Sequence, residues 1–250
     1  MNQKRRLSLV APGDQLTGIA PVELERAARS CRPGDATHHG LLRLSATLAR
    51  RAVLGSVAPS VRSELLGGLE LLEAWTRGKT GERELRDRRA LCFSAAVLVE
   101  KKTVDAVLEA QKHLGAQRKT GLDAHADLVL QRYVSLGAHC ATSAVVLSLD
   151  AVAEPVRVTE VPQQVLAARA YQATGLGSVR HGEFRAKAWE QAEWEAVREG
   201  APSEHGTAAL ALQVFHEYLG ARWKSYADSE RLVQRDFIEW AMSGQPGQAP

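Results

Sequence analysis

The chain has 250 residues, 45% of them hydrophobic and 24% charged, so it can bury a core of ordinary size and does not have the composition of a disordered protein. Its 32 basic and 29 acidic residues give a net charge of +3 and are spread along the chain, which excludes the concentrated basic patch that nucleic-acid binding requires. Aromatic residues make up only 5%, and the apolar content comes mainly from Ala, Leu and Val, which favours helices over sheets.

The three cysteines, Cys31, Cys92 and Cys140, lie far apart in the chain, which is typical of a reducing compartment and argues against a disulfide framework. The N-terminus begins like a secretory signal, but its apolar run of about five residues is shorter than such a signal needs. No stretch reaches the roughly 18 apolar residues of a membrane span. We therefore expect a cytoplasmic protein without a membrane-spanning segment.

Residues 1–40 are expected to form an N-terminal arm with one short helix. Pro12, Gly13 and Gly18 interrupt the first part of this arm. Pro21 can begin a helix that runs through Cys31, because the N–H that proline lacks is not needed in a first turn.

Residues 41–154 are expected to form an N-terminal helical half. Apolar residues recur there at helical spacing, and one such helix should close at Gly78. The run from Ala90 to Val99 is apolar on nearly all sides, which predicts a helix in the centre of the protein. The expected helices of this half cover residues 41–54, 61–75, 84–102, 104–114 and 122–136, and a run of small residues follows over 137–153.

Residues 155–242 are expected to form a C-terminal helical half, followed by a disordered tail over 243–250 that has nothing apolar to bury. The stretch "EPVRVTEVP", residues 154–162, alternates like a strand but is short and lies between prolines, so it is interpreted as a connector. Helices are expected over 163–173, 183–199, 207–223 and 229–242. The sequence thus predicts an all-α protein of nine or ten helices, arranged as a helical bundle or an array of helical hairpins.

Three glycines, Gly175, Gly177 and Gly182, raise the question of a phosphate-binding loop. Their spacing is G-x-G-x4-G and a helical segment precedes them, whereas a dinucleotide fingerprint needs G-x-G-x-x-G after a strand. A second stretch, "RGKTG", lacks the first glycine of a P-loop, because Glu73 stands at that position. Both stretches are therefore interpreted as turns between helices, and no nucleotide or other cofactor is expected.

The two glycine turns also resemble each other. In "EAWTRGKTGERELRDRR" and "RAYQATGLGSVRHGEFRAK", an aromatic residue near a helix end precedes a glycine-rich basic turn and then Glu, an apolar residue and Arg. Glycine suits the end of one helix, and Glu suits the start of the next. This shared order predicts that the two helical halves are weakly related.

Residues 41–153 resemble a family of α-helical immunity proteins from bacterial polymorphic-toxin systems. The likeness lies in a leucine-rich helix that ends in Ala74-Trp75 before a glycine turn, in "ELRDRRALCFSAA", and in the small-residue helix "LGAHCATSAVVLSLDAV". Members with this pattern carry further histidines on the last helix, where Val146 and Asp150 stand here. The resemblance implies a non-enzymatic protein that neutralises a partner toxin by binding it.

Histidines and carboxylates offer few metal or catalytic candidates. In "LDAHAD", Asp123 and Asp127 are about 40° apart on a helix while His125 points to the opposite side, so the three cannot share one ion. His38 and His39 are placed in a solvated loop, where a weak metal contact is the alternative. His139 is interpreted as a core histidine beside the inert thiol of Cys140. We expect no metal centre.

One helical segment, residues 183–199, carries a candidate contact surface. Phe184 begins a narrow core face that continues through Ala188, Ala192 and Ala196, whereas Trp194 falls among charged residues on the other side. An exposed Trp is typical of binding hot spots, although another helix or the N-terminal arm could also cover it. Glu190, Glu193 and Trp194 are the predicted partner-binding residues.

The expected function is thus that of a protein-binding module, namely an immunity protein whose partner is a toxin. A helical enzyme or small-ligand receptor with a pocket between the halves, using His139 or His181, remains the alternative. A homo-oligomeric structural protein is a further possibility. A pocket in which histidines and carboxylates converge favours the enzyme, whereas a filled core and an exposed Trp194 favour binding.

Overall fold

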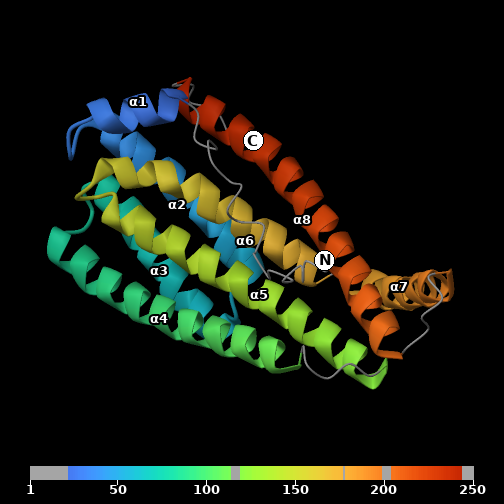
Figure 1. Cartoon of the computed structure of the whole chain (residues 1–250). Coiled ribbons are helices and arrows are strands. Elements are labelled where there is room, and N and C mark those ends of the chain that lie inside the picture. Colours follow the sequence, from blue (N-terminus) through green and yellow to red (C-terminus); the bar gives the residue numbers. More distant parts are fainter. Residues whose placement is uncertain (1–21, 114–118, 177, 199–203, 244–250) are drawn as a thin grey trace, which may run out of the picture.

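The computed structural model describes residues 22–113, 119–176, 178–198 and 204–243, and these residues form an all-α bundle without a strand (Figure 1). The predicted fold class is confirmed. In chain order the elements are α1 (Val22–Ser30), α2 (Ala36–Ser56), α3 (Pro59–Thr76), α4 (Glu82–His113), α5 (Lys119–Asp150), the 3-10 helix η2 (Pro155–Glu160), α6 (Val161–Gly175), α7 (Ser178–Arg198) and α8 (Glu204–Met242).

Local signals set the ends of the first helices. The carboxylate of Asp35 caps α2 by accepting the backbone N–H of His38 at 2.6 Å. At the end of α3, Gly78 has a φ of +70°, and the N–H groups of Gly78 and Lys79 each donate at 2.9 Å to the carbonyls of Trp75 and Ala74. This is a Schellman motif, which glycine permits without strain. The predicted helix end at Gly78 is confirmed.

Three helices are continuous where the sequence pattern predicts a break. α4, α5 and α8 each join two segments that were expected to be separate, so the described residues contain eight α-helices and not nine or ten. Gly137 shows why a small residue did not end α5. A Cβ at this position would lie 3.1 Å from the carbonyl oxygen of Ala168, so glycine lets α6 approach closely there. Tertiary packing thus carries the helix through a position of weak propensity.

The segment interpreted as a connector, residues 154–162, forms the 3-10 helix η2 and the start of α6. Its strand-like alternation therefore does not produce a strand. Val158 is buried between helices, and the guanidinium of Arg157 pairs at 3.0 Å with the carboxylates of Glu154 and Glu160. Prolines at the start of η2 and of α6 favour helical first turns, where their missing N–H groups are not needed.

α5 and α6 lie side by side in the middle of the bundle, with α2 packed against both (Figure 1). α3 and α4 flank α5, while α8 packs on α6 and carries α7 at the end of the bundle. The main hydrophobic cluster draws on residues from both sides of the connector, from Leu24 in α1 to Ile238 in α8. A second cluster, rich in aromatic residues, joins α5, α6 and α8.

α4 lies at an edge of the bundle, which corrects the expectation of a central helix over Ala90–Val99 (Figure 1). One face of α4, with Leu85, Cys92 and Val99, is buried against the bundle. The opposite face is apolar as well but is exposed. A helix that is apolar on both sides was expected to be buried on both sides, and here only one side has a neighbour among the described residues.

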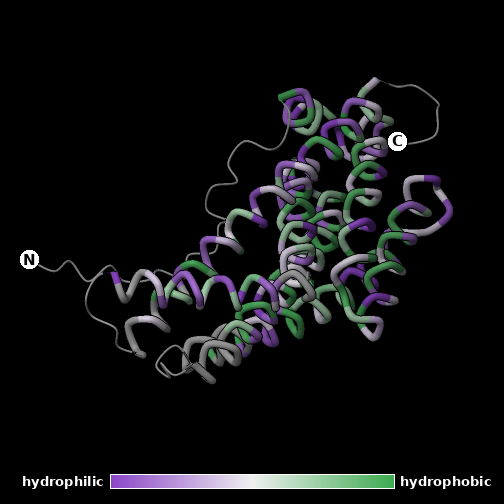
Figure 2. Tube along the Cα trace, turned by 90° about the vertical axis from the view of Figure 1, so that its right-hand side faces the viewer, coloured by the Kyte–Doolittle hydropathy of each residue, from purple (hydrophilic) through white to green (hydrophobic). Residues whose placement is uncertain are grey.

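Hydrophilic and hydrophobic residues follow one another along each helix, as Figure 2 shows. Among the described helices, none has a stretch apolar enough to cross a membrane.

Candidate partner-binding surface

The small-residue face of α7 packs on α8. Ala188 and Ala192 are 1% and 0% exposed, and Ala192 forms a small cluster with Ala211 of α8. This confirms the predicted core face for these residues; the side chain of Ala196 lies outside the described part of the structure. The small side chains let α7 approach α8 closely, and they fix which face of α7 points outward.

Glu190, Glu193 and Trp194, the predicted contact residues, are all exposed on that outward face. Trp194 is 64% exposed, so the part of the chain that the structure describes leaves most of its ring uncovered. The guanidinium of Arg198 lies 5.2 Å from the centre of the Trp194 ring, one turn along the helix. Such a cation–π contact restrains a large side chain without burying it.

Glu193 also has an intramolecular partner that the sequence did not indicate. The indole N–H of Trp189, which packs on the Ala192–Ala211 cluster, donates a hydrogen bond to the carboxylate of Glu193. Glu193 is therefore held against α7, whereas Glu190 has its carboxylate in solvent. The outward face thus presents one restrained and one unrestrained carboxylate beside the indole of Trp194.

His181, in the first turn of α7 and thirteen residues before Trp194, anchors the start of this helix. It is buried, and its Nε2–H donates at 2.7 Å to the carbonyl of Thr174, in the last turn of α6. Its ring meets Phe215 and Tyr218 edge-on, and Tyr218 stacks on Phe184 with 3.8 Å between the ring centres. His181 therefore caps a helix end and fixes the junction of α6, α7 and α8.

Burial lowers the pKa of His181, and the nearby cations of Arg222 and Arg185 lower it further, against the opposing effect of the Thr174 hydrogen bond. Burial likewise lowers the pKa of His216. A neutral His181 with Nε2 protonated leaves Nδ1 as an acceptor, and no hydrogen-bond donor among the described residues reaches that atom. This geometry describes a structural histidine inside the protein more than a general base beside a substrate.

The glycine stretch is a turn between helices, as predicted, with Gly177 outside the described residues. Gly175 ends α6, where a Cβ would lie 2.7 Å from Cγ2 of Val134 and 3.1 Å from the carbonyl oxygen of Leu130. Gly182 lies inside α7 with open space around it. Gly175 is therefore required for close packing against α5, whereas Gly182 is not.

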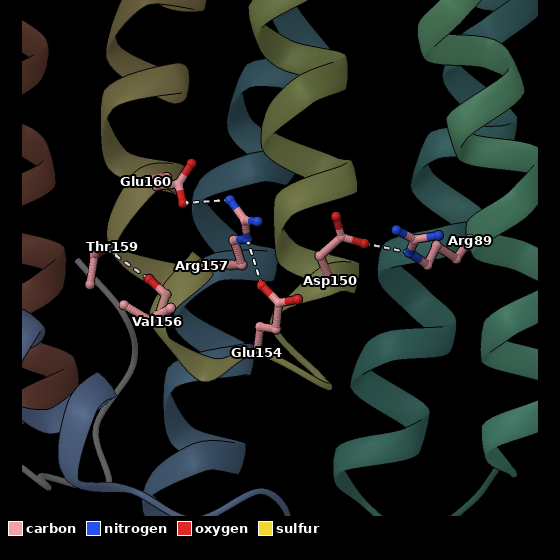
Figure 3. A network of polar contacts seen from close by, with 7 residues as sticks. All are labelled: Arg89, Asp150, Glu154, Val156, Arg157, Thr159 and Glu160. Carbon is pink, nitrogen blue, oxygen red and sulfur yellow. Dashed lines mark hydrogen bonds and ion pairs between the residues drawn. The ribbon is translucent and has the colours of Figure 1, made fainter.

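A cleft of about 560 Å³ opens where the connector meets the start of α4. It is lined by Pro33, Glu82, Leu85, Arg86, Arg89, Leu149, Asp150, Val152, Ala153, Glu154 and Arg157. Arg89 is paired with Asp150, and Arg157 is held by Glu154 and Glu160 (Figure 3).

Neither His139 nor His181, the histidines considered for an enzyme, lines this cleft. His139 is half-buried on α5, and His181 is engaged with Thr174. Arg89 and Arg157 are each paired with a carboxylate of the cleft, so the cleft offers charged hydrogen-bonding groups but no acid–base pair with a histidine.

His38 is not in a solvated loop, which corrects the sequence interpretation. It is buried in the first turn of α2, where its Nε2–H donates at 2.8 Å to the carbonyl of Ala151 and its Nδ1 accepts the N–H of Gly34 at 2.8 Å. His39 lies half-buried, edge-on to Trp75 with 5.2 Å between the ring centres. With both ring nitrogens engaged, His38 ties the start of α2 to the end of α5 and cannot bind a metal ion.

Asp127 has a different role from the one considered for "LDAHAD". Its carboxylate accepts the guanidinium of Arg185 at 2.6 Å, which links α5 to α7. The side chains of Asp123 and His125 lie outside the described residues. Over the residues that the structure places, no three His, Cys, Asp or Glu side chains come together in a possible metal site.

Burial raises the pKa of the Cys92 thiol to about 11 and that of Cys140 to about 12. Both cysteines contact the hydrophobic core, and at neutral pH almost none of either thiol is in the nucleophilic thiolate form. The raised pKa of Cys140 agrees with its interpretation as an inert thiol.

Sequence reasoning missed the aromatic support around Tyr218, the Arg185–Asp127 pair and the exposed face of α4. The first two join elements that are far apart in the chain, so no local pattern indicates them.

No protein-family model, no curated protein and no solved structure matches this chain.

Proposed function

We propose that the protein is a non-enzymatic protein-binding module, an immunity protein that neutralises a partner toxin by direct binding through the outward face of α7. The observation that carries this proposal is Trp194, a large aromatic side chain that is 64% exposed on a helix anchored to the bundle from behind. Tryptophan at such a position is the residue type most enriched in binding hot spots.

The chemistry of the α7 face indicates what the partner should present. Trp194 needs an apolar pocket, and the unrestrained carboxylate of Glu190 beside it favours a basic or amide-rich rim. Arg198 and Glu193 restrain the surface before binding, which lowers the entropy cost of association. A toxin with a basic surface around an apolar pocket fits these features.

The resemblance of residues 41–153 to immunity proteins supplies the kind of partner, and the α7 face supplies the site. These two parts of the proposal are separable. Loss of a captured protein on substitution of Trp194 tests the site, while protection of cells against that protein tests neutralisation.

The experiment uses three forms of the full chain as bait in the native host: wild type, Trp194→Ala and Leu232→Ala. Leu232 is the matched control, because it is 55% exposed on α8 and lies away from the α7 face. We expect mass spectrometry to identify a protein retained by wild type and by Leu232→Ala, and retained at least tenfold less by Trp194→Ala.

Expression of the captured protein alone should then slow growth, and co-expression with this chain should restore it. Equal retention by all three baits would contradict the α7 site. Repeated recovery of the bait alone, or a captured protein that is harmless, would contradict the toxin-neutralising function.

The charged cleft supports a second candidate function, that of a receptor for a small ligand. Its volume of about 560 Å³ lies within the range of small-molecule sites, and Arg86, Asp150 and Glu154 offer charges of both signs. A panel of free amino acids, which carry both charges, provides a direct probe. A rise in melting temperature that Arg86→Ala removes would favour this candidate, and no rise with any member would count against it.

A further inference from the structure

The face of α4 that points away from the bundle is the largest unexplained apolar feature of the described structure. Six of its side chains are between 47% and 59% exposed, although exposed positions of an edge helix are normally polar. These are Leu91, Phe93, Val97, Leu98, Val104 and Leu108, which together are called the outer face of α4.

The centre of the outer face follows a regular seam. Ala90, Ser94, Val97, Lys101, Val104 and Leu108 succeed one another at spacings of four and three residues. An average spacing of 3.5 residues keeps such a row facing one partner helix, as in a coiled coil. Over 19 residues the seam is about 28 Å long. Its geometry therefore fits another helix lying along α4.

The area of the outer face suits a second copy of the same chain. Six half-exposed apolar side chains represent on the order of 600 Å², which is at the upper end of what a soluble monomer leaves open. Two such faces would bury about 1,200 Å², the lower limit of a standard stable interface, when the partner helix covers the seam together with the flanking Leu91, Phe93 and Leu98. A symmetric pair in which both flanks are covered thus reaches the required area.

The order of residues along the seam favours an antiparallel pair. Small residues, Ala90 and Ser94, occupy its first half, and the larger Val104 and Leu108 occupy its second half. Antiparallel pairing sets Ala90 against Leu108 and Ser94 against Val104, so that small meets large along the interface.

Lys101, the one charged residue of the seam, also favours antiparallel over parallel pairing. In an antiparallel pair it lies against Val97 of the other copy, where its aliphatic stem can pack while the ammonium group reaches solvent. A parallel pair would set Lys101 against Lys101, which like charges disfavour. We propose that the outer face of α4 binds the same face of a second copy, antiparallel, about a two-fold axis close to Leu98.

This dimer does not depend on the function proposed above. α4 and α7 lie at different edges of the bundle, so pairing through α4 leaves Trp194 accessible (Figure 1). A dimer without a toxin partner, or a toxin partner without a dimer, is a possible result, and the two proposals fail separately.

The first test measures the mass of the purified full chain by sedimentation equilibrium from about 1 to 100 µM. We expect wild type to reach twice 27.2 kDa within this range. Leu98→Glu should remain at 27.2 kDa, because two carboxylates would meet at the two-fold axis. Leu232→Glu, at 55% exposure against 59% for Leu98, is the matched control and should still dimerise.

Circular dichroism must show equal helix content for these variants, and Val104→Asp replaces Leu98→Glu if the latter fails to fold, because the short side chain of aspartate cannot reach solvent from the seam. A wild-type chain that stays monomeric at the highest concentration would overturn the proposal. A dimer that survives both Leu98→Glu and Val104→Asp would overturn it too.

The second test fixes the direction of pairing by cysteine cross-linking, with the wild-type chain as background for its three native cysteines. Leu98→Cys should form a disulfide-linked dimer with itself on mild oxidation, because Leu98 lies near the axis. Ala90→Cys should not link to itself but should link to Leu108→Cys when the two variants are mixed. Linkage of Ala90→Cys to itself would indicate parallel pairing and contradict the antiparallel arrangement.

Discussion

The guanidinium of Arg51 on α2 pairs with the carboxylate of Glu230 on α8 at 3.2 Å, across 179 residues of chain. The Glu230 side chain is only 8% exposed, and it also accepts a hydrogen bond from Gln234 and lies 3.8 Å from Arg169 on α6. Arg51 in turn lies over the ring of Phe237. This buried carboxylate therefore links α2, which precedes the connector in the chain, to α6 and α8, which follow it.

Replacement of Glu230 by Ala should lower the free energy of unfolding by about 2 kcal/mol, because two arginines would be left beside a cavity without their shared partner. Urea denaturation followed by circular dichroism measures this change. Asp228→Ala is the control, since Asp228 pairs with Lys224 and Arg231 on the surface and should change stability by less than about 0.5 kcal/mol. Equal effects of the two substitutions would contradict a structural role for Glu230.

The two described glycines of the turn between α6 and α7 should respond to alanine in opposite directions. Gly175→Ala should destabilise the protein by about 2 kcal/mol, because the new methyl group would press on Val134 and on the backbone of α5. Gly182→Ala should stabilise it by about 0.5 kcal/mol, since the site is open and helical and alanine restricts the unfolded chain. Thermal unfolding of both variants checks the signs; a shift in the same direction would refute this distinction.

Stability should fall on acidification in the range in which the unfolded histidines titrate. The pKa of His181 in the folded protein is lowered by burial, so below a pH of about 6.5 the unfolded chain binds a proton more readily than the folded one. The stability that neutral His181 contributes is complete above that pH. It is lost as the pH falls through the lower pKa that His181 has in the folded protein. His216, whose pKa is also lowered, adds to the same slope.

His181→Gln keeps a donor for the Thr174 carbonyl but cannot titrate in this range. The free energies of unfolding of wild type and His181→Gln should therefore converge between pH 7.5 and pH 5, when compared by denaturant titration in the same buffer series. An unchanged pH slope in the variant would show that His181 is not the group responsible.

The buried thiols should resist alkylation in the folded protein. With pKa values raised to about 11 and about 12, Cys92 and Cys140 carry roughly a thousandth or less of their population as thiolate at pH 8. Mass spectrometry after treatment with iodoacetamide should find these two cysteines unmodified in the native protein and fully modified in urea. Rapid labelling of Cys92 before unfolding would contradict its packing between α3 and α4.

Much of the secondary structure follows from local features of the sequence. The helical period of the leucines, the caps at Asp35 and Gly78, and the small-residue stripe of α7 all act within a few turns, so they could be predicted without knowledge of the fold. Helix ends were less predictable. Gly137 looked like a break between segments, but it lies inside α5 because α6 packs against it.

The candidate site was predictable in part. The place of Trp194 among charged residues left open whether it is exposed or covered by another part of the chain, and the described residues leave it 64% exposed. Its restraint by Arg198 could be found at the same helical spacing. The support from His181, Phe184 and Tyr218 could not, because it depends on how α6, α7 and α8 meet.

The amino-acid sequence by itself determined that this protein is helical and which residues of each helix share a face, because the helical repeat links positions three and four apart. Only the tertiary structure decided which face found a partner. α4 has two apolar faces, and the bundle covers the one with Cys92 and Val99 while Leu98 on the other stays exposed. Likewise His38, predicted in a loop, is buried because the carbonyl of Ala151 lies against it. The helical repeat determines which residues share a face of a helix. Contacts between residues far apart in the chain determine whether that face is buried and against which helix it packs.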